Sequence, residues 1–311
     1  MQVIQTLSAI PTAIRGCVVA IGNFDGLHRG HQFLIDATTA RARDLGEASC
    51  VLSFEPHPKH YFQPQLPPFR LTPLAQKTSL LRALGVDYFL CLDFNAAMAA
   101  VTADDFTQHI LINQLGVSNV LVGQDFVFGH NRCGNLQTLR HYGQTHGFSV
   151  QPSDLLTDAE GMVISSSRIR DYLAMGDVAN AANLLGRPFA IMGAVERGQQ
   201  LATGLGFPTA NVALGDYQHP AYGVYAVRVH TPQQRNLAGV ANIGVRPTVG
   251  GADTARLEVH LFDWQGNLYD QTIEVELRHF LRPERKFNGL DELRAQIAVD
   301  VAEAKKFFST F

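Results

Sequence analysis

The sequence lacks the features of a membrane-spanning or disulfide-stabilised protein. No apolar run reaches the roughly 18 residues that a transmembrane helix needs, and no basic segment followed by an unbroken apolar core opens the chain. Its four cysteines, Cys17, Cys50, Cys91 and Cys133, include no C-x-x-C pair. We therefore expect a soluble cytoplasmic protein without a secretory signal. We interpret the cysteines as small buried side chains in a reducing compartment.

An excess of charge of either sign is also missing. Lys and Arg total 25 against 28 Asp and Glu, which gives a net charge of −3. This weakly acidic balance argues against binding of nucleic acid or an anionic membrane by charge alone, but it permits a local phosphate pocket. A hydrophobic fraction of 46% over 311 residues excludes disorder and favours two domains. The sequence leaves the oligomeric state open.

The first part of the chain alternates strand-like and helix-like segments. Apolar runs predict strands at residues 17–24, 49–54, 88–94, 117–122 and 148–152. Helical spacing between them predicts helices at residues 31–45, 72–84, 103–115 and 135–146. This alternation indicates an α/β fold with a doubly wound parallel sheet, covered on both faces. Ligands of such folds bind at the carboxyl ends of the strands.

The pattern changes near residue 186. A further helix is expected from residue 168 to about residue 185, and Gly186, Arg187 and Pro188 then mark a domain boundary. Period-two runs beyond it predict a small antiparallel β-barrel, with strands at residues 189–195, 222–229, 237–243, 256–262 and 272–277. A C-terminal helix at residues 290–308 carries its apolar face at Leu293, Ile297, Val301 and Phe308. We therefore divide the chain into domains 1–186 and 187–311.

Glycines and two histidines follow the first predicted strand, in the segment GNFDGLHRGH at residues 22–31. His28 and His31 stand at the start of a predicted helix, with Gly30 between them and with Gly22 and Phe24 before them. Free N–H groups at a helix start, together with glycines, form a site for a polyphosphate. The imidazoles can donate hydrogen bonds to an α-phosphate and to the departing pyrophosphate, so this chemistry needs no protein nucleophile.

Two further segments of the first domain carry polar groups suited to a nucleotide. Ser165, Ser166 and Ser167 can cap the helix that follows them and present hydroxyl and N–H groups to phosphate. Arg168 then supplies a fixed cation for the β- and γ-phosphates. Asp125 lies in the loop after an apolar strand, where it can bind ribose, metal or substrate.

Oxygen donors suited to Mg²⁺ lie early in the barrel domain, in the segment GFPTAN at residues 206–211. Pro208 fixes one turn of backbone after Gly206. The Thr209 hydroxyl and the Asn211 amide, two residues apart, can hold Mg²⁺ against ATP phosphates. As a sequence of six residues, this segment also fits an ordinary structural turn.

Glu258 and His260 share one face of the strand predicted at residues 256–262, and apolar residues occupy the other face. A carboxylate beside a phosphoryl donor suits the role of a general base. Imidazole is also basic near neutral pH, so both residues are candidates.

These motifs resemble those of two families. GNFDGLHRGH is similar to the FAD synthetase branch of the nucleotidyltransferase superfamily, as are SFEPHP at residues 53–58, VGQDFVFG at residues 122–129 and ISSSRIR at residues 164–170. Ser167 stands where that family commonly has Thr. GFPTAN resembles the signature of riboflavin kinase, together with residues 222–225, 239–248 and 280–287. The resemblance covers nearly the whole chain and is to the bacterial bifunctional riboflavin kinase/FAD synthetase (FMN adenylyltransferase) family.

The resemblance implies a role for each domain. Residues 1–186 form an FMN adenylyltransferase domain, in which Pro56 and Pro58 shape the flavin side and His57 has no assigned role. Residues 187–311 form a riboflavin kinase domain, in which Glu258 accepts the proton of the riboflavin 5′-hydroxyl. The implied substrates are riboflavin, FMN and ATP, with FAD as product and Mg²⁺ as metal. Neither nucleic acid nor membrane is an implied partner.

The chain departs from the family at one place. A Gly-Arg pair commonly precedes GFPTAN, whereas Ala202 and Thr203 stand here, so a cation that would neutralise phosphate is missing and efficient phosphorylation is in question. Two alternatives follow: a nucleotidyltransferase with another acceptor, or a flavin-nucleotide binding module whose kinase half has decayed. The presence of Thr209, Asn211 and Glu258 together argues against decay.

Overall fold

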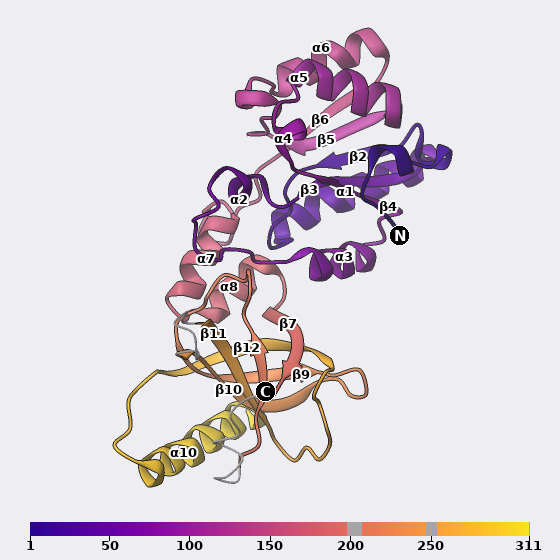
Figure 1. The fold of residues 1–311 in the computed structure, drawn as a ribbon. Coiled ribbons are helices and arrows are strands. Elements are labelled where there is room, and N and C mark those ends of the chain that lie inside the picture. The colour runs from indigo at the N-terminus through magenta and orange to yellow at the C-terminus, as the bar shows by residue number, and fades with distance from the viewer. Residues whose placement is uncertain (198–206, 247–253, 311) are drawn as a thin grey trace. The chain divides into compact units, whose positions relative to one another are not determined.

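The computed structural model describes residues 1–197, 207–246 and 254–310. The chain forms two compact units (Figure 1). The first comprises Met1–Pro67 and Thr72–Ser165, and the second comprises Pro68–Leu71 and Ser166–Phe311. Among the helices in the described part of the chain, none combines the length and the apolar character that crossing a membrane requires.

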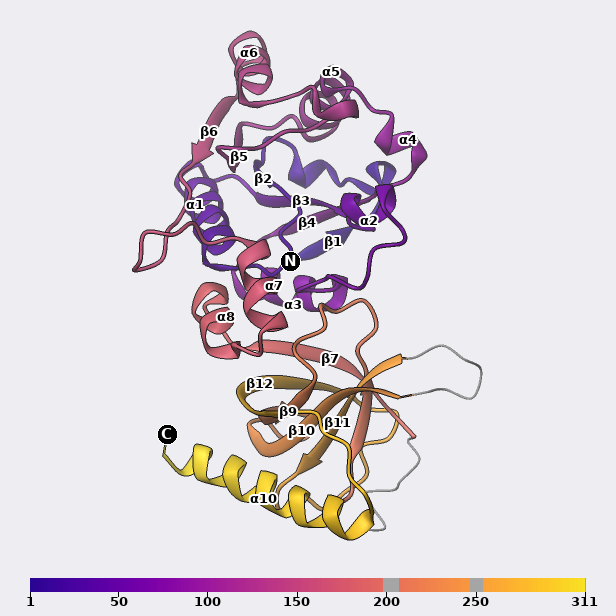
Figure 2. The same cartoon turned by 90° about the vertical axis from the view of Figure 1, so that its left-hand side faces the viewer.

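A parallel sheet of six strands forms the centre of the first unit (Figure 2). The strands lie in the order β1-β4-β3-β2-β5-β6, and each adjacent pair is parallel, which confirms the predicted fold class. Their bounds are β1 (Gln2–Ile4), β2 (Val18–Ile21), β3 (Ser49–Glu55), β4 (Tyr88–Asp93), β5 (Asn119–Gly123) and β6 (Ser149–Ser153). The sequence did not predict β1, because three residues are too few to show a period.

Helices cover both faces of this sheet, as doubly wound folds require. Their bounds are α1 (Arg29–Leu45), α2 (Pro58–Phe62), α3 (Leu74–Ala83), α4 (Ala96–Ala99), α5 (Ala103–Asp105) and α6 (Leu136–His146). The helix predicted at residues 103–115 begins as α5 and continues as a π-helical segment, Phe106–Leu115. Short 3₁₀ turns lie at Leu7–Ala9, Thr12–Ile14 and His130–Arg132.

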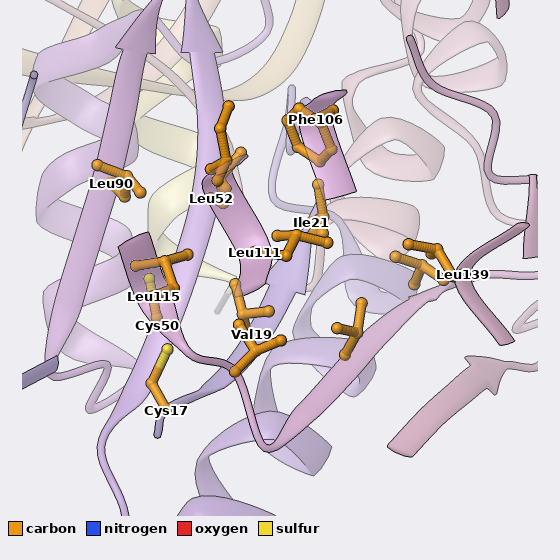
Figure 3. Packing of buried hydrophobic residues seen from close by; sticks show 14 of the residues in the cluster. Cys17, Val19, Ile21, Cys50, Leu52, Leu90, Phe106, Leu111, Leu115 and Leu139 are labelled. Atoms are coloured by element: carbon orange, nitrogen blue, oxygen red, sulfur yellow. The ribbon is translucent and has the colours of Figure 1, made fainter. Parts of the chain in front are cut away.

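Alternate residues of β2 enter two different hydrophobic clusters. Val19 and Ile21 pack with Leu115 of the π-helical segment on one face (Figure 3). Val18 and Ala20 pack on the other face, against side chains of α1 and α3. Because both faces of the sheet are buried, a ligand can reach its strands only through the loops at their ends.

Three of the four cysteines are buried in this unit, as predicted: Cys17, Cys50 and Cys91. The side-chain hydrogen bond with Cys17, followed by burial, raises the pKa of the Cys50 thiol well above its usual value. This thiol is therefore protonated and inert at neutral pH. Cys133 is exposed, so its interpretation as a buried side chain is wrong. It follows a surface turn rather than lying in a strand.

A closed antiparallel barrel forms the centre of the second unit, as predicted (Figure 1). The strand order is β10-β11-β8-β7-β12-β9, and pairing of β9 with β10 closes the barrel. The bounds are β7 (Phe189–Glu196), β8 (Ala210–Ala213), β9 (Gly223–His230), β10 (Leu237–Arg246), β11 (Thr254–Leu261) and β12 (Thr272–Pro283). β8 was not predicted, because its sequence ANVA has little β-propensity and pairing with β7 and β11 defines it.

In the described part of the second unit, the barrel is accompanied by the helices α7 (Ser166–Ala174), α8 (Val178–Leu185) and α10 (Leu290–Ser309). The prediction of a single helix from residue 168 to 185 is wrong, because the structure has two helices there, α7 and α8. Gly176 separates α7 from α8 with a φ of +79°, a left-handed conformation that ends a helix. α10 packs on β9, β10 and β12, with Val301 and Phe308 against the barrel core, as its amphipathic pattern predicts.

Candidate active sites

Three loops with predicted site residues leave neighbouring strands of the parallel sheet. The segment GNFDGLHRGH follows β2, which lies between β3 and β5. Pro56 and Pro58 follow β3, and Asp125 follows β5. Because the carboxyl ends of parallel strands lie at one edge, the fold brings these three loops together. The strand order also reverses between β2 and β5, the position where ligands bind in such folds.

The two histidines of this edge form a stacked pair. His28 is the N-cap of α1, and its Nδ1 accepts a hydrogen bond from the backbone N–H of His31 at 3.3 Å. The ring centroids lie 3.6 Å apart with 16° between the planes. Because Nδ1 accepts, a neutral His28 carries its proton on Nε2 and can donate from there to phosphate. A Cβ at Gly30 would lie 3.3 Å from the His28 ring, so glycine gives this ring its space.

The backbone between β2 and α1 is strained. Phe24, Gly26 and Leu27 have φ angles of 50°, 91° and 41°. Such angles are uncommon for Phe and Leu and persist only where the surroundings fix them. The buried Phe24 ring meets the edge of His31 at 5.3 Å, and a Cβ at Gly22 would crowd the same ring at 3.2 Å. This loop is therefore shaped by its packing.

Buried polar groups outside the motifs also hold this loop, and the sequence analysis missed them. The Thr72 backbone N–H donates to Asp25 Oδ1 at 3.0 Å, and the Thr72 hydroxyl accepts from the Gly26 N–H at 2.8 Å. Lys77 Nζ donates to the Asn23 carbonyl at 2.7 Å. The one signal available from sequence was the helical spacing, which places Lys77 on the buried face of its helix, four residues before Leu81.

The loop after β3 leads into the short helix α2. Pro58 is its first residue, and His57 is its N-cap, with Nδ1 accepting from the Lys59 backbone N–H at 3.1 Å. His57 thus has a local structural role. Pro56 precedes this cap and, with Pro58, restricts the path of the chain from β3.

Aromatic side chains gather beside this loop, and the sequence analysis did not single them out. The ring centroids of Phe54, Tyr61, Phe62 and Phe94 lie 5.3–5.7 Å from their neighbours in the group. Phe62 is 64% exposed. An exposed ring supported by other rings can stack on a flat heteroaromatic ligand.

The remaining predicted residues of the first site lie in two different units. Asp125 is exposed after β5, and a Cβ at Gly123 would lie 3.1 Å from its Oδ1. Ser165 is the last residue of the first unit, whereas α7, which belongs to the second unit, starts with Ser166, Ser167 and Arg168. Arg168 donates to the Tyr172 hydroxyl at 3.3 Å. The roles of these residues toward a nucleotide stay predictions.

In the barrel, Glu258 lies between two asparagines on adjacent strands. The register pairs Glu258 of β11 with Asn211 of β8 on one side and with Asn242 of β10 on the other. Directly opposed residues point to the same face of a sheet, so one carboxylate and two amides form a polar row across three strands. Leu257 and Val259 are buried on the opposite face, as the alternation predicts.

The turn before β8 is tied to the same strand. The Pro208 carbonyl can only accept a hydrogen bond, so Nδ1 of His260, 3.0 Å away, carries the proton and donates it. Phe207 packs against the His260 ring at 5.4 Å. Thr209 then lies directly before β8. Some positions discussed above fall outside the described residues: Ala202, Thr203, Gly206 and the last two residues of the segment 239–248.

Asn242 is a candidate that only the strand register makes evident. Its Nδ2 donates to Glu284 Oε1 at 3.4 Å. A Cβ at Gly244 would overlap the same carboxylate, so glycine lets Glu284 lie against β10. The polar row beside Glu258 therefore continues to a second carboxylate.

Comparisons with known proteins match both halves of the chain. A family model for FAD synthetase matches residues 10–168, and one for riboflavin kinase matches residues 185–308. A crystal structure of a Streptococcus pneumoniae protein, described as a macrolide-efflux protein, is 31% identical and covers 96% of both chains with a TM-score of 0.84. That protein shares the fold.

Curated relatives match over nearly the full length. A Pseudomonas fluorescens protein is 45% identical over 98% of this chain and 97% of its own. An Escherichia coli K12 protein is 44% identical over 98% and 96%, and a Haemophilus influenzae protein is 40% identical over 100% of each. All three are named bifunctional riboflavin kinase/FMN adenylyltransferase. With both family models in the expected order, this chain belongs to the bifunctional riboflavin kinase/FMN adenylyltransferase family.

Proposed function

We propose that this chain phosphorylates riboflavin to FMN with one ATP and transfers AMP from a second ATP to FMN, giving FAD and pyrophosphate. We assign AMP transfer to the carboxyl edge of the parallel sheet and phosphorylation to the face of the barrel that carries Glu258. The observation that carries this proposal is the presence of one polar site in each compact unit: the stacked His28 and His31, and the row centred on Glu258.

The first site suits AMP transfer because its donors are fixed before the reaction. An FMN phosphate oxygen attacks the α-phosphorus, the bond to the β-phosphate oxygen breaks, and pyrophosphate leaves. Negative charge grows on the phosphoryl oxygens and on the leaving group. Nε2–H of His28 and the positive end of the α1 helix dipole can stabilise that charge. The protein supplies orientation and charge rather than a nucleophile.

The loop after β3 suits the flavin. Pro56 and Pro58 give it a restricted path, and the exposed Phe62 ring is supported by Tyr61 and Phe94. A flat isoalloxazine ring can stack on such a surface. We therefore place the flavin on this side and the nucleotide on the side of His28 and Asp125.

The barrel site suits phosphorylation because it combines a base with fixed amides. Glu258 would accept the proton of the riboflavin 5′-hydroxyl while that oxygen attacks the γ-phosphorus and ADP leaves. Asn211 and Asn242, directly opposite Glu258 on its two neighbours, can hold the carboxylate in one orientation. His260 donates from Nδ1 to Pro208 and so supports the turn, while its Nε2 keeps a basic lone pair. We assign the base to Glu258 because its carboxylate lies in the row between Asn211 and Asn242.

The barrel site also has a donor set that fits Mg²⁺. The Thr209 hydroxyl and the Asn211 amide oxygen are hard oxygen ligands, and Glu258 lies in register with Asn211. Mg²⁺ retains several waters and binds phosphate oxygens, so two protein ligands suffice for its site. When bound, the ion would neutralise phosphate charge in the kinase reaction.

One incubation tests the proposal: the protein with riboflavin, ATP and Mg²⁺, followed by chromatography of the flavins. FMN followed by FAD is the expected result, and EDTA should abolish FMN formation. If FMN is the only product, the nucleotidyltransferase domain acts on an acceptor other than FMN. FAD formed only from added FMN would indicate a decayed kinase half, and absence of both products would overturn the proposal.

A further inference from the structure

Lys77 is a buried charged group that the reactions above do not use. Its side chain on α3 is 0% exposed. Nζ donates to the Asn23 carbonyl at 2.7 Å and contacts Ser53 Oγ at 3.5 Å. Burying an ammonium carries a large desolvation cost that its contacts must offset, whereas an apolar side chain of similar length fills such a place without that cost. The lysine therefore points to a role beyond packing.

The group that Lys77 holds is the start of the strained loop. Asn23 directly precedes Phe24, the first of the residues with left-handed φ. Such residues are strained and persist only where surrounding contacts over-determine them. The Ser53 hydroxyl also donates to the Asn23 carbonyl, at 3.3 Å. Together with the Lys77 ammonium, it fixes the beginning of the loop. Thr72 fixes its middle at Gly26.

The loop ends at the proposed nucleotide site. His28, four residues after Phe24, caps α1 and stacks on His31. An ammonium enclosed by protein is screened much less than a surface lysine. Its positive charge therefore stabilises the inward-turned carbonyl of Asn23 in one position. If the loop shifted, the imidazoles would shift with it. A misplacement of about 1 Å lowers the rate of a reaction that depends on positioning by roughly 100-fold.

We propose that Lys77 is a positioning residue of the adenylyltransferase reaction, which acts by fixing the Asn23 carbonyl and through it the loop that places His28 and His31. The inference rests on the proposed assignment of AMP transfer to this loop. It predicts that Lys77 contributes to turnover rather than to binding of FMN or to phosphorylation of riboflavin in the barrel.

Two substitutions test the ammonium, and one matched control tests stability alone. Lys77→Met removes the charge and the donor at similar length, and Lys77→Gln keeps a donor without charge. The Asn23 carbonyl still has the Ser53 hydroxyl in both variants. Leu81→Ala removes a side chain that is equally buried one turn later on α3, among apolar residues. The FMN-forming activity of the same molecules reports that the barrel is intact.

The kinetic constants for FAD formation decide the question. We expect Lys77→Met to lower kcat by roughly 10- to 100-fold, with the KM for FMN changed less than about threefold and FMN formation unchanged. Lys77→Gln should fall between this variant and the unaltered protein. Leu81→Ala should lower the melting temperature of the first unit while kcat, measured well below that temperature, stays within about twofold.

Two results would overturn the inference. One is a kcat for Lys77→Met within twofold of the unaltered protein. The other is an equal loss of kcat in Leu81→Ala at an equal loss of stability. If Lys77→Met does not fold, the kcat of Lys77→Gln decides by the same criteria. A His28→Ala variant separates the two proposals. Normal FAD formation by His28→Ala would refute the proposed adenylyltransferase site. Loss of FAD formation in His28→Ala, together with normal FAD formation in Lys77→Met, would refute only the role of Lys77.

Discussion

Removing the imidazoles of His28 and His31 should stop one reaction and spare the other. The double substitution His28→Ala with His31→Ala removes the stacked donors at the start of α1. We expect FAD formation from added FMN to fall by about 100-fold or more, the worth of fixed donors to a transition state. FMN formation should stay near normal because the polar row at Glu258 lies in the other unit. Chromatography of both products measures this, and an equal fall of FMN formation in folded protein would contradict it.

Glu258 and His260 can be distinguished by matched amide substitutions. Glu258→Gln keeps the size of the side chain between Asn211 and Asn242 but removes its basic charge. We expect FMN formation at saturating ATP to drop by about 100-fold, as loss of a general base does. Adenylylation of added FMN should persist.

His260→Gln is the control for that substitution. A glutamine can still donate toward the Pro208 carbonyl, so we expect less than about a tenfold change in FMN formation. Near-normal turnover in Glu258→Gln together with a collapse in His260→Gln would reverse the assignment of the base.

The site residues that could be predicted from the sequence are those that stand close together in one short motif. His28 and His31 stand in one decapeptide, and their glycines and helix start stand with them. Lys77 and Asn23 are 54 residues apart, and their contact exists only because α3, which lies between β3 and β4 in the chain, returns to the loop after β2. Asn242 likewise becomes a candidate through strand register. Contacts across such separations leave no spacing pattern in one sequence.

At the scale of elements, α10 is held to the barrel by more than its apolar face. Arg282 of β12 donates from Nε and from one terminal nitrogen to the two Asp300 oxygens, at 2.8 and 2.7 Å. Gln296 donates to the same carboxylate at 2.9 Å. Asp300 is only 3% exposed, although the helical pattern alone makes an aspartate a surface residue. The apolar stripe was predictable, but this buried pair was not.

Breaking this pair should destabilise the barrel unit. Asp300→Ala leaves the Arg282 guanidinium without its buried carboxylate, and loss of one partner of a buried pair costs about 3–5 kcal/mol. We expect a lower midpoint in denaturant unfolding followed through FMN formation. Glu303→Ala, at an exposed position of the same helix, should change the midpoint little.

A paired substitution checks the electrostatic cause. Arg282→Met combined with Asp300→Leu removes both charges and should recover most of the lost stability, because apolar groups replace a buried pair at little cost. If the double variant is less stable than Asp300→Ala, packing rather than the unpaired charge explains the loss.

At the scale of the whole molecule, the boundary between the two compact units differs from the boundary that the sequence pattern indicates. The period of the apolar residues changes after Pro188, whereas α7 and α8 group with the barrel and α8 packs on β7 and β12. Helical periodicity shows that a helix buries one face, but not which neighbour buries it. The domain boundary at residue 186 therefore stays a prediction, and fragments of the chain can test it.

A fragment that begins at Gly186 should phosphorylate riboflavin and form no FAD. It contains all six barrel strands and α10, and the pairing of β7 with β12 needs nothing before Phe189. It lacks α8, whose Leu184 and Leu185 are buried, and a buried leucine contributes about 1.5–3 kcal/mol. A fragment that begins at Ser166 should therefore be equally active but melt at a higher temperature. Chromatographic assay of FMN and thermal unfolding of both fragments measure this. Activity only in the longer fragment would move the functional boundary to α7, and inactivity of both would show that the barrel depends on the first unit or on Pro68–Leu71, which both fragments lack.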